Sequence, residues 1–422
     1  MKNSSDYFQQ LDQEDVLHQY RDMFFIPKNK NNNDLIYYCG NSLGLLSKQA
    51  NAAVKQELDD WATYGVEGHL EAKYPWVKYH EFLCEPMAEI VGAKPKEVVM
   101  MNGLTTNLHL MMISFYRPTK TRHKILIEFS AFPSDRYAVE SQIKFHGYDP
   151  NESLIILKPS SKNGYITIEQ IQEILKTEGE EIALVLIGSV NYYTGQAYPI
   201  SQITKLAKSY GANVGFDLAH GAGNLDLKLH EDGPDFAVWC GYKYLNGGPG
   251  CIAGCFVHER HHDDHNLPRL SGWWGHDKVN RFKMGSKFEM MIGAEGWQLS
   301  NPPILAMAAL RESLLLFQKA GINNLRTKSI RMHNLLANLL REWAHPNINI
   351  ITPEKDDEKG CQLSIQLKQP DKKIFNSLIE NNIIGDWREP DVIRIAPVPL
   401  YNCYSELFIF YNSLKRIIEN HG

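Results

Sequence analysis

Short apolar runs alternate with amphipathic stretches along the central part of the chain. The runs are rich in β-branched and aromatic residues and are bounded by Gly, Pro and Asp, a pattern that predicts buried strands. The stretches between them repeat apolar residues at helical spacing. The predicted strands cover residues 98–101, 124–129, 153–158, 183–190, 213–217, 236–240 and 252–257, and predicted helices cover residues 134–145, 167–177 and 200–210. This alternation predicts an α/β fold with a mostly parallel, doubly wound sheet.

The pattern changes after the Pro302-Pro303 pair. Residues 304–343 are helical in pattern with a break near Gly321, strands are predicted at residues 362–367 and 392–397, and residues 354–360 are predicted to form a solvated loop. Near the N-terminus, a helix is predicted over residues 46–65 with Ser47 as its candidate N-cap. We therefore expect a large domain over residues 50–305 and a smaller α+β domain formed by residues 1–49 with 306–422.

Composition and charge restrict the functional classes. Of the 422 residues, 43% are hydrophobic and 22% are charged, which is ordinary for a globular protein. The net charge of −5 is spread along the chain, so no basic face points to nucleic acid or to an anionic membrane. The chain starts with polar residues and has no apolar run of membrane-spanning length, which favours a cytoplasmic protein. Its seven cysteines form no CxxC pair, so we expect reduced, buried thiols.

Two candidate chemical groups follow predicted strands. Asp217 ends the run at residues 213–217, and Lys243 lies just after the run at residues 236–240. Residues just past the carboxyl ends of neighbouring parallel strands converge on one crevice. A carboxylate and an amine brought together there suit pyridoxal phosphate, whose aldehyde binds a lysine and whose ring nitrogen takes an acid partner. An ordinary ion pair is the alternative, and these two residues alone favour it.

Two further segments could hold the phosphate and the ring of such a cofactor. Leu104, Thr105 and Thr106 stand where a predicted strand turns into a helix, and helix N-termini bind phosphate. Phe132 follows the predicted strand at residues 124–129 and offers an aromatic face. A simple threonine N-cap and a core phenylalanine are the structural alternatives.

Longer runs of sequence extend this picture over most of the chain. They are YYCGNSLGL, NGLTTNLHLMMISFYRP, AFPSDRYAVESQ, NYYTGQ, VGFDLAHGAGN, CGYKYLNGGPG, LSGWWGH, RFKM, SNPPIL and IRIAPVPLYN. Through these runs the chain resembles the kynureninases, fold type I pyridoxal phosphate enzymes of the aminotransferase-like class, from about residue 36 to residue 404. The resemblance implies hydrolysis of kynurenine or 3-hydroxykynurenine to L-alanine and an anthranilate, in the route from tryptophan to NAD. It also implies a homodimer with shared active sites.

The resemblance assigns roles to the residues of the cofactor site. It implies Lys243 as the Schiff-base lysine and Asp217 as the partner of the pyridine nitrogen. Tyr242 would touch the phosphate and act as a proton donor. The remaining cofactor-binding residues implied by the resemblance are Leu104, Thr105, Phe132, Pro133, Ser134, Asp135 and His220, with Trp273 and Asn301 reaching the cofactor or substrate from the second subunit.

The resemblance also implies a substrate pocket. Arg394 should bind the substrate carboxylate through its bidentate fork, with exposure to solvent as the alternative for this residue. Ser42 and His69 would line the aromatic end, and His69, Ser300 and Asn301 resemble the pattern that favours 3-hydroxykynurenine. Relatives place a serine near the phosphate where this chain has Gly188-Ser189, so a phosphate contact by Ser189 stays open. The preferred substrate, the catabolic or biosynthetic role and the groups that handle hydration of the γ-carbonyl also stay open.

Rival functions come from the same cofactor class and from other classes. A transaminase or a cysteine desulfurase would share the cofactor, but desulfurases place a histidine where this chain has Tyr242 and need a mobile nucleophilic cysteine. His258-Glu259-Arg260-His261-His262 satisfies the HExxH pattern of zinc metalloproteases, although its position after a predicted strand favours a polar loop, and we expect no metal. A non-catalytic scaffold or binding protein, which predicts a colourless preparation, is the third class.

Overall fold

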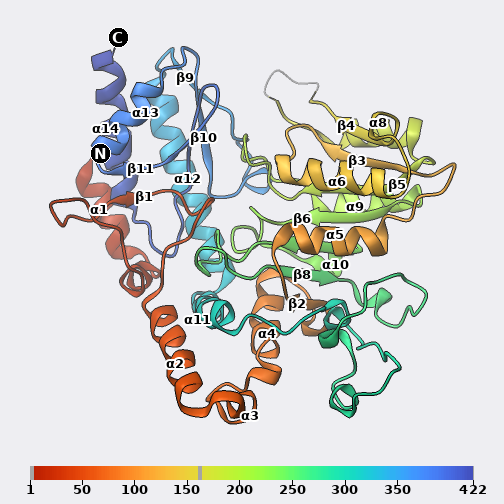
Figure 1. Ribbon diagram of the computed structural model, residues 1–422. Coiled ribbons are helices and arrows are strands. Elements are labelled where there is room, and N and C mark those ends of the chain that lie inside the picture. Colours follow the sequence, from red (N-terminus) through yellow and green to blue (C-terminus); the bar gives the residue numbers. More distant parts are fainter. Residues whose placement is uncertain (1–3, 160–163, 422) are drawn as a thin grey trace.

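A seven-stranded sheet forms the centre of the computed structural model, which describes residues 4–159 and 164–421 (Figure 1). Its strands lie in the order β2-β8-β7-β6-β5-β3-β4. Strands β4, β3, β5, β6 and β7 are parallel, whereas β8 pairs antiparallel with both β7 and β2. The strands are β2 (Val98–Met100), β3 (Lys124–Glu128), β4 (Leu154–Leu157), β5 (Ile182–Gly188), β6 (Asn213–Asp217), β7 (Phe236–Trp239) and β8 (Gly254–Val257). The predicted mostly parallel α/β sheet is confirmed.

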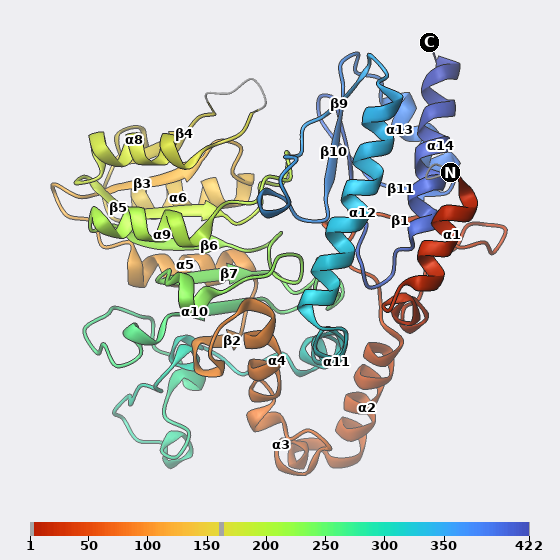
Figure 2. The same ribbon diagram turned by 180° about the vertical axis from the view of Figure 1, so that it is seen from behind.

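Helices cover both faces of this sheet. Helices α5 (Leu104–Phe115) and α6 (Pro133–Phe145) lie on the face seen in Figure 1, and α8 (Ile168–Glu178) and α9 (Ile200–Ser209) lie on the face seen in Figure 2. Alternate residues of β5 supply the two cores: Leu184 and Leu186 pack with α5 and α6, and Val185 and Ile187 pack with α8 and α9. A parallel strand that is buried on both faces must be apolar throughout, which explains the continuous apolar run.

A smaller antiparallel sheet lies beside the large one. Its strands are β9 (Ile348–Ile350), β10 (Leu363–Leu367), β12 (Asp386–Arg388) and β13 (Val392–Ile395), in the order β12-β13-β10-β9. Helices α1 (Ser5–Glu14), α12 (Ile322–Trp343), α13 (Lys372–Glu380) and α14 (Tyr404–His421) share a separate hydrophobic core with it. The two-residue strands β1 (Ile36–Tyr37) and β11 (Ile383–Ile384) pair in parallel and join the N-terminal segment to this unit.

Long helices connect the two sheets. Helix α2 (Lys48–Tyr64) begins after Ser47, whose fully buried hydroxyl accepts the Ala50 N–H at 3.0 Å, so the predicted N-cap is confirmed. Helix α2 packs against α11 (Ile304–Ala320), which also packs against α4 (Glu81–Val91). Gly321 separates α11 from α12 as predicted, and its φ of 77° is one that favours glycine.

The remaining helical elements are short. Three four-residue helices are α3 (Gly68–Glu71), α7 (Pro150–Ser153) and α10 (Leu229–Asp232). The 3-10 turns cover His18–Met23, Gly65–Glu67, Trp76–Lys78, Pro95–Glu97, Glu259–His261, Trp273–Gly275, Arg281–Lys283, Ala294–Trp297 and Asp356–Glu358.

The segment at residues 354–360 is only partly the predicted solvated loop. Glu354, Asp356 and Asp357 are exposed and Glu358 is half-buried. Lys359, in contrast, is only 1% exposed, because its ammonium group donates to Asn334 Oδ1 at 2.8 Å and pairs with Asp356. All seven cysteines are free thiols, and six of them are buried, as expected. Within residues 4–159 and 164–421, no helix combines the length and the apolar character needed to cross a bilayer.

Candidate active site

A cavity opens at the carboxyl ends of the parallel strands of the large sheet. Asp217 is the last residue of β6, and Lys243 lies in the turn that follows β7. Both side chains line this cavity, so the predicted convergence at the strand ends is found. The full lining consists of Leu104, Thr105, Glu128, Phe132, Ser134, Asp135, Gly188, Val190, Tyr192, Asp217, Ala219, His220, Tyr242 and Lys243.

Three carboxyl groups meet on one side of the cavity. Asp217 is 7% exposed and accepts the Ala219 N–H at 2.6 Å. Burial, and then the neighbouring Asp217, raises the pKa of the Asp135 carboxyl well above its usual range. Burial also raises the pKa of Glu128 to about 7, although the Gly188 N–H, which Glu128 Oε1 accepts at 3.1 Å, acts in the opposite direction. The raised pKa values show that burial favours the protonated forms of Asp135 and Glu128, and a cationic ligand group bound here would favour their ionised forms.

Lys243 lines the same cavity as these carboxyl groups. Its Nζ lies 5.7 Å from the centroid of the Phe132 ring. Phe132 is 44% exposed, so the alternative of a plain core phenylalanine is wrong. The neighbouring Tyr242 is half-buried, and burial followed by the effect of Cys240 raises the pKa of its hydroxyl to about 12. Tyr242 therefore keeps its proton at neutral pH and can donate it.

Two helix N-termini converge at one end of the cavity. Helix α5 begins at Leu104 and α6 begins at Pro133, and the hydroxyls of Thr105 and Ser134 lie 2.9 Å apart. The N-cap of α5 is Gly103, which makes no side-chain capping bond, so the reading of this segment as a threonine N-cap is wrong. First-turn N–H groups without a capping side chain, together with two hydroxyls, form a suitable site for a phosphate group.

His220 completes the cavity on the side of the smaller unit. It is 7% exposed, and its Nδ1 has no hydrogen-bond partner among the described residues. Burial, and then the positive charges of Lys243, Arg394 and Arg388, hold the pKa of His220 well below its usual range. His220 is therefore a neutral imidazole in this environment.

Ser189 does not line the cavity. Its side chain is fully buried, and a Cβ placed on Gly221 would lie 2.3 Å from Ser189 Oγ. The side-chain oxygen has no hydrogen-bond partner among the described residues. The position of Ser189 therefore does not support a contact between its side chain and the phosphate.

Arg394 is buried and fixed. It is 1% exposed, so the alternative of a solvent-facing side chain is wrong. Its Nε donates to Asp386 Oδ1 at 3.1 Å, and its Nη1 donates to the backbone carbonyl of Tyr192 at 2.6 Å. Arg394 does not line the cavity directly, but Tyr192 does, and the Arg394 guanidinium carbon lies 5.9 Å from the centroid of the Tyr192 ring.

Other predicted residues lie outside the cavity of the single chain. Trp273 is 38% exposed and packs edge-on against Phe282. His69 packs edge-on against Trp76. The predicted residues that do not line the cavity are Ser42, His69, Pro133, Trp273, Ser300, Asn301 and Arg394. Ser300 and Asn301 instead border a separate hollow beside Gly103, just before α5.

The structure adds residues that the sequence reasoning did not assign to the cavity. Tyr192 packs edge-on against Phe132 with ring centroids 5.5 Å apart. Tyr192 belongs to the run NYYTGQ, which contributes to the family resemblance, but the resemblance assigned no role to this residue. Glu128 lies within the predicted strand at residues 124–129, and nothing in the sequence pattern assigned it to the site. The added residues are Glu128, Gly188, Val190, Tyr192 and Ala219.

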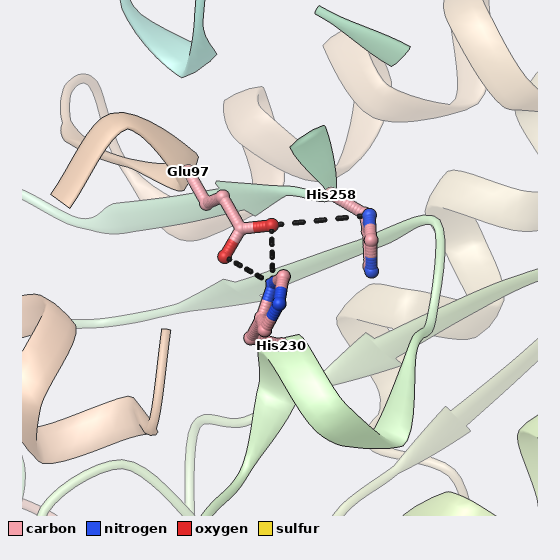
Figure 3. Close-up of side chains that lie close together, drawn as sticks. All are labelled: Glu97, His230 and His258. Carbon is pink, nitrogen blue, oxygen red and sulfur yellow. Dashed lines mark hydrogen bonds and ion pairs between the residues drawn. The ribbon is translucent and has the colours of Figure 1, made fainter. Parts of the chain in front are cut away.

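The HExxH pattern does not form a metalloprotease helix. Glu259–His261 is a single 3-10 turn, and the His262 ring nitrogen lies 3.0 Å from the Val257 carbonyl. His258 instead faces Glu97 and His230 (Figure 3). It follows Val257 of β8, which pairs with Phe236 at the start of β7, so the cluster lies at the amino end of that strand, whereas the cavity lies at the carboxyl ends.

The facing atoms of this Glu97 cluster already have protein partners. His258 Nδ1 accepts the Arg260 N–H, and Glu97 accepts the backbone N–H groups of Lys94 and Glu259. His230 Nδ1 lies 3.0 Å from Glu97 Oε1. The cluster therefore joins three chain segments through hydrogen bonds.

The cavity fits pyridoxal phosphate. Asp135 Oδ1 and His220 Nδ1 are buried without hydrogen-bond partners among the described residues, which leaves polar atoms for a ligand ring. The converging helix N-termini suit its phosphate, Phe132 offers a face for its ring, and Lys243 offers an amine for its aldehyde.

Comparisons with known proteins agree with this geometry. Residues 325–414 match the family model "Kynureninase C-terminal domain", and residues 39–239 match "Aminotransferase class I and II". A kynureninase of Koribacter versatilis is 52% identical over 411 residues, which cover 97% of this chain and 96% of that protein. A kynureninase of Myxococcus xanthus is 52% identical over 414 residues, which cover 98% of this chain and 97% of that protein.

Solved structures support the fold alone. The cysteine desulfurase CsdA from Escherichia coli superposes with a TM-score of 0.77 at 16% identity, over 96% of this chain and 98% of that chain. A cystine C–S lyase named C-DES superposes with a TM-score of 0.75 at 18% identity, over 91% of this chain and 97% of that chain. Because near-complete coverage at 52% identity accompanies a cavity that fits the cofactor, the chain belongs to the kynureninase family of pyridoxal phosphate-dependent hydrolases.

Proposed function

We propose that this protein hydrolyses the Cβ–Cγ bond of L-kynurenine, 3-hydroxykynurenine or both, yielding L-alanine and anthranilate or 3-hydroxyanthranilate. The observation that carries the proposal is the convergence of Lys243, Asp217 and Phe132 in one cavity of a chain about half identical to kynureninases. A transaminase or a cysteine desulfurase is the alternative within this fold. Tyr242 before the lysine and the buried cysteines argue against a desulfurase, whose chemistry needs a mobile thiol.

The residues that hold the cofactor follow from the cavity. The first turn of α5, with Thr105, and Ser134 of α6 would bind its phosphate. Phe132 would stack on its ring, and Asp217 would hold the proton on its ring nitrogen, with Asp135 and His220 nearby. When bound, the cofactor supplies an aldehyde for covalent attachment and a protonated ring that stabilises carbanions.

The side chains of the protein carry the proton transfers. Lys243, once released by the substrate amine, would remove the Cα proton as a general base. Water then adds to the γ-carbonyl, the Cβ–Cγ bond breaks, and anthranilate leaves before alanine. Tyr242, which keeps its proton at neutral pH, would protonate Cβ. Arg394 would bind the α-carboxylate and so fix the Cα–H bond relative to Lys243.

We further propose a homodimer in which the partner completes each site. Trp273 and Asn301 are exposed in the single chain and lie outside its cavity, together with Ser300. Exposed apolar side chains surround a hollow formed by α2 and the start of α11, among them Trp61 at 61% exposure and Leu305 at 40%. An apolar surface of this kind favours burial against a second copy. Ser42 and His69 would face the aromatic end of the substrate.

The domain division is also a proposal. Residues 50–305 would bind the cofactor, and residues 1–49 with 306–422 would form the small domain. The separate hydrophobic core of the smaller sheet, which draws on α1 as well as α12 and α14, supports this division.

The proposed activity is tested by incubating the purified protein with each substrate and no keto acid. Release of the fluorescent anthranilate product together with L-alanine in equal amounts is expected. Product formation that requires an added keto acid would instead indicate a transaminase, and sulfide release from cysteine would indicate a desulfurase. The ratio of kcat/KM on the two substrates decides the preferred ring.

A further inference from the structure

The Arg394 guanidinium is held by a carboxylate on the neighbouring strand. Arg394 lies on β13 and Asp386 on β12, and the two are direct cross-strand partners. Besides the Nε bond at 3.1 Å to Asp386 Oδ1, Arg394 Nη2 lies 3.0 Å from Asp386 Oδ2. This side-on pairing, together with the Tyr192 carbonyl on Nη1, fixes the plane of the guanidinium.

A second guanidinium binds the same carboxylate. Arg388 stands two residues after Asp386 on β12, so both side chains leave the same face of the strand. Arg388 Nη2 donates to Asp386 Oδ2 at 3.1 Å, and its Nε lies 2.9 Å from Asp386 Oδ1. Asp386 thus lies between two arginines, and the three charges sum to one positive charge.

This trio lies beside Tyr192, a residue of the cavity lining. The guanidinium carbons of Arg388 and Arg394 lie 5.8 Å and 5.9 Å from the centroid of the Tyr192 ring, and Tyr192 lines the cavity. The charges of both arginines reach His220 on the cavity wall. A net positive charge at this position attracts an anionic substrate group.

Arg394 retains donors for such a group. An arginine has five N–H donors, and the contacts to Asp386 and Tyr192 use at most three of them. One N–H on each terminal nitrogen remains without a partner among the described residues. The pairing with Asp386 therefore orients the guanidinium without consuming the donors that a substrate carboxylate needs.

We propose that Asp386 is a positioning residue that orients Arg394 toward the α-carboxylate of the amino-acid substrate, and that Arg388 anchors Asp386 and keeps the site cationic. This inference rests on the proposed function, because it assigns the α-carboxylate to Arg394. Asp386 is not part of the cavity lining, so it acts through Arg394. Since Arg394 acts in binding, loss of its orientation is expressed mainly in KM.

The test uses the cofactor-loaded enzyme with Asp386→Asn, Arg388→Met and the control Asp391→Asn. Asp391 is an acidic residue of the turn between β12 and β13, and it accepts hydrogen bonds from the Tyr193 hydroxyl and the Gln366 side-chain amide. Among the described residues it forms no hydrogen bond or ion pair with Arg394. We expect Asp386→Asn to raise KM about tenfold while kcat changes less than about threefold. Arg388→Met should raise KM by a smaller factor than Asp386→Asn. Asp391→Asn should have the KM and kcat of wild type.

Two small ligands separate positioning from a structural effect. L-alanine carries the carboxylate and amine of the substrate, whereas 2-aminoacetophenone carries only its aryl ketone. Asp386→Asn should weaken L-alanine binding about tenfold and leave 2-aminoacetophenone binding unchanged. The inference is overturned if Asp386→Asn weakens binding of both ligands equally. It is also overturned if KM and L-alanine binding are unchanged in both Asp386→Asn and Arg388→Met.

The same measurements distinguish failure of the proposed function from failure of the inference. If wild type does not hydrolyse kynurenine but its L-alanine binding still depends on Asp386, the proposed function fails and the positioning role stands. If wild type hydrolyses kynurenine and Asp386→Asn behaves as wild type, only the inference fails. Absence of L-alanine binding in wild type overturns the inference together with the carboxylate role of Arg394.

Discussion

The hydroxyl of Thr105 lies 2.9 Å from the hydroxyl of Ser134, and this contact joins the first turns of two helices whose residues are 29 positions apart. Helix α5 follows β2 and helix α6 follows β3, yet both begin at the same cavity. Two helix dipoles and two hydroxyls therefore act on one ligand group, and this arrangement supports binding of the cofactor phosphate.

Removing the Thr105 hydroxyl should weaken cofactor retention. Thr105→Val keeps the side-chain shape but removes one hydrogen bond to a charged group, which costs about 1.5–3 kcal/mol, or roughly a 10- to 150-fold rise in the Kd for pyridoxal phosphate. The Kd is measured by titrating cofactor-free protein. Thr106→Val is the matched control, because Thr106 is in the same turn but does not line the cavity. Equal Kd values for the two variants would contradict the phosphate role of Thr105.

Lys243→Ala should abolish both covalent cofactor attachment and turnover. The amine that attaches the aldehyde is also the proposed base, so kcat should fall at least about 10²–10⁴-fold, the range that general acid–base catalysis contributes. The visible absorbance of the bound cofactor should shift to that of the free aldehyde. Lys319→Ala, which removes an exposed lysine of α11, should resemble wild type. Retention of the wild-type spectrum by Lys243→Ala would refute the assignment.

Glu128→Gln should change the pH dependence of stability in the cofactor-free protein. The pKa of Glu128 is about 7 when folded and near 4.5 when unfolded, so the folded state binds this proton more tightly. Glu128 therefore makes its full contribution to the stability of wild type below pH 4.5, and this contribution is lost as the pH rises toward and through 7. The amide cannot ionise, so Glu128→Gln should gain up to about 3 kcal/mol relative to wild type between pH 5 and pH 8.

Chemical denaturation at several pH values measures this difference. Glu173→Gln, on the exposed face of α8, is the control and should show no such trend. A pH-independent difference between Glu128→Gln and wild type would show that the Glu128 carboxyl is not held protonated by its surroundings.

Mixed dimers should reveal whether the site is shared. Lys243→Ala and Trp273→Ala subunits are each expected to be inactive alone. If Trp273 serves the partner's cavity, a mixed dimer contains one intact and one doubly altered site, so random mixing should restore about a quarter of wild-type activity. If Trp273 serves its own cavity, every site in a mixed dimer carries one change and no activity returns. Light scattering measures the assembly state of each preparation.

Local patterns in the sequence predicted the strands of the large sheet and the α/β class of the fold. The apolar runs predicted each strand of the large sheet, because a strand buried on both faces must be apolar throughout. Ser47 and Gly321 marked helix boundaries through side-chain capping and backbone freedom, which are local properties. Asp217 and Lys243 could be brought together because parallel strands end at the same edge.

Contacts between distant segments were decided only by the tertiary structure. The wall of Glu128, Asp135 and Asp217 exists because β3 and β6 flank β5, an order that no local pattern contains. The strand register places Asp386 opposite Arg394, and this pairing orients a buried arginine for which the sequence had left a solvent-facing position as the alternative. Packing between distant segments likewise placed Tyr192 of the run NYYTGQ against Phe132, and His258 of the HExxH pattern beside Glu97. The periodicity of apolar residues predicts which face of one helix or strand is buried. A functional site, however, forms where several elements meet, and the packing and strand register that bring them together depend on the whole fold.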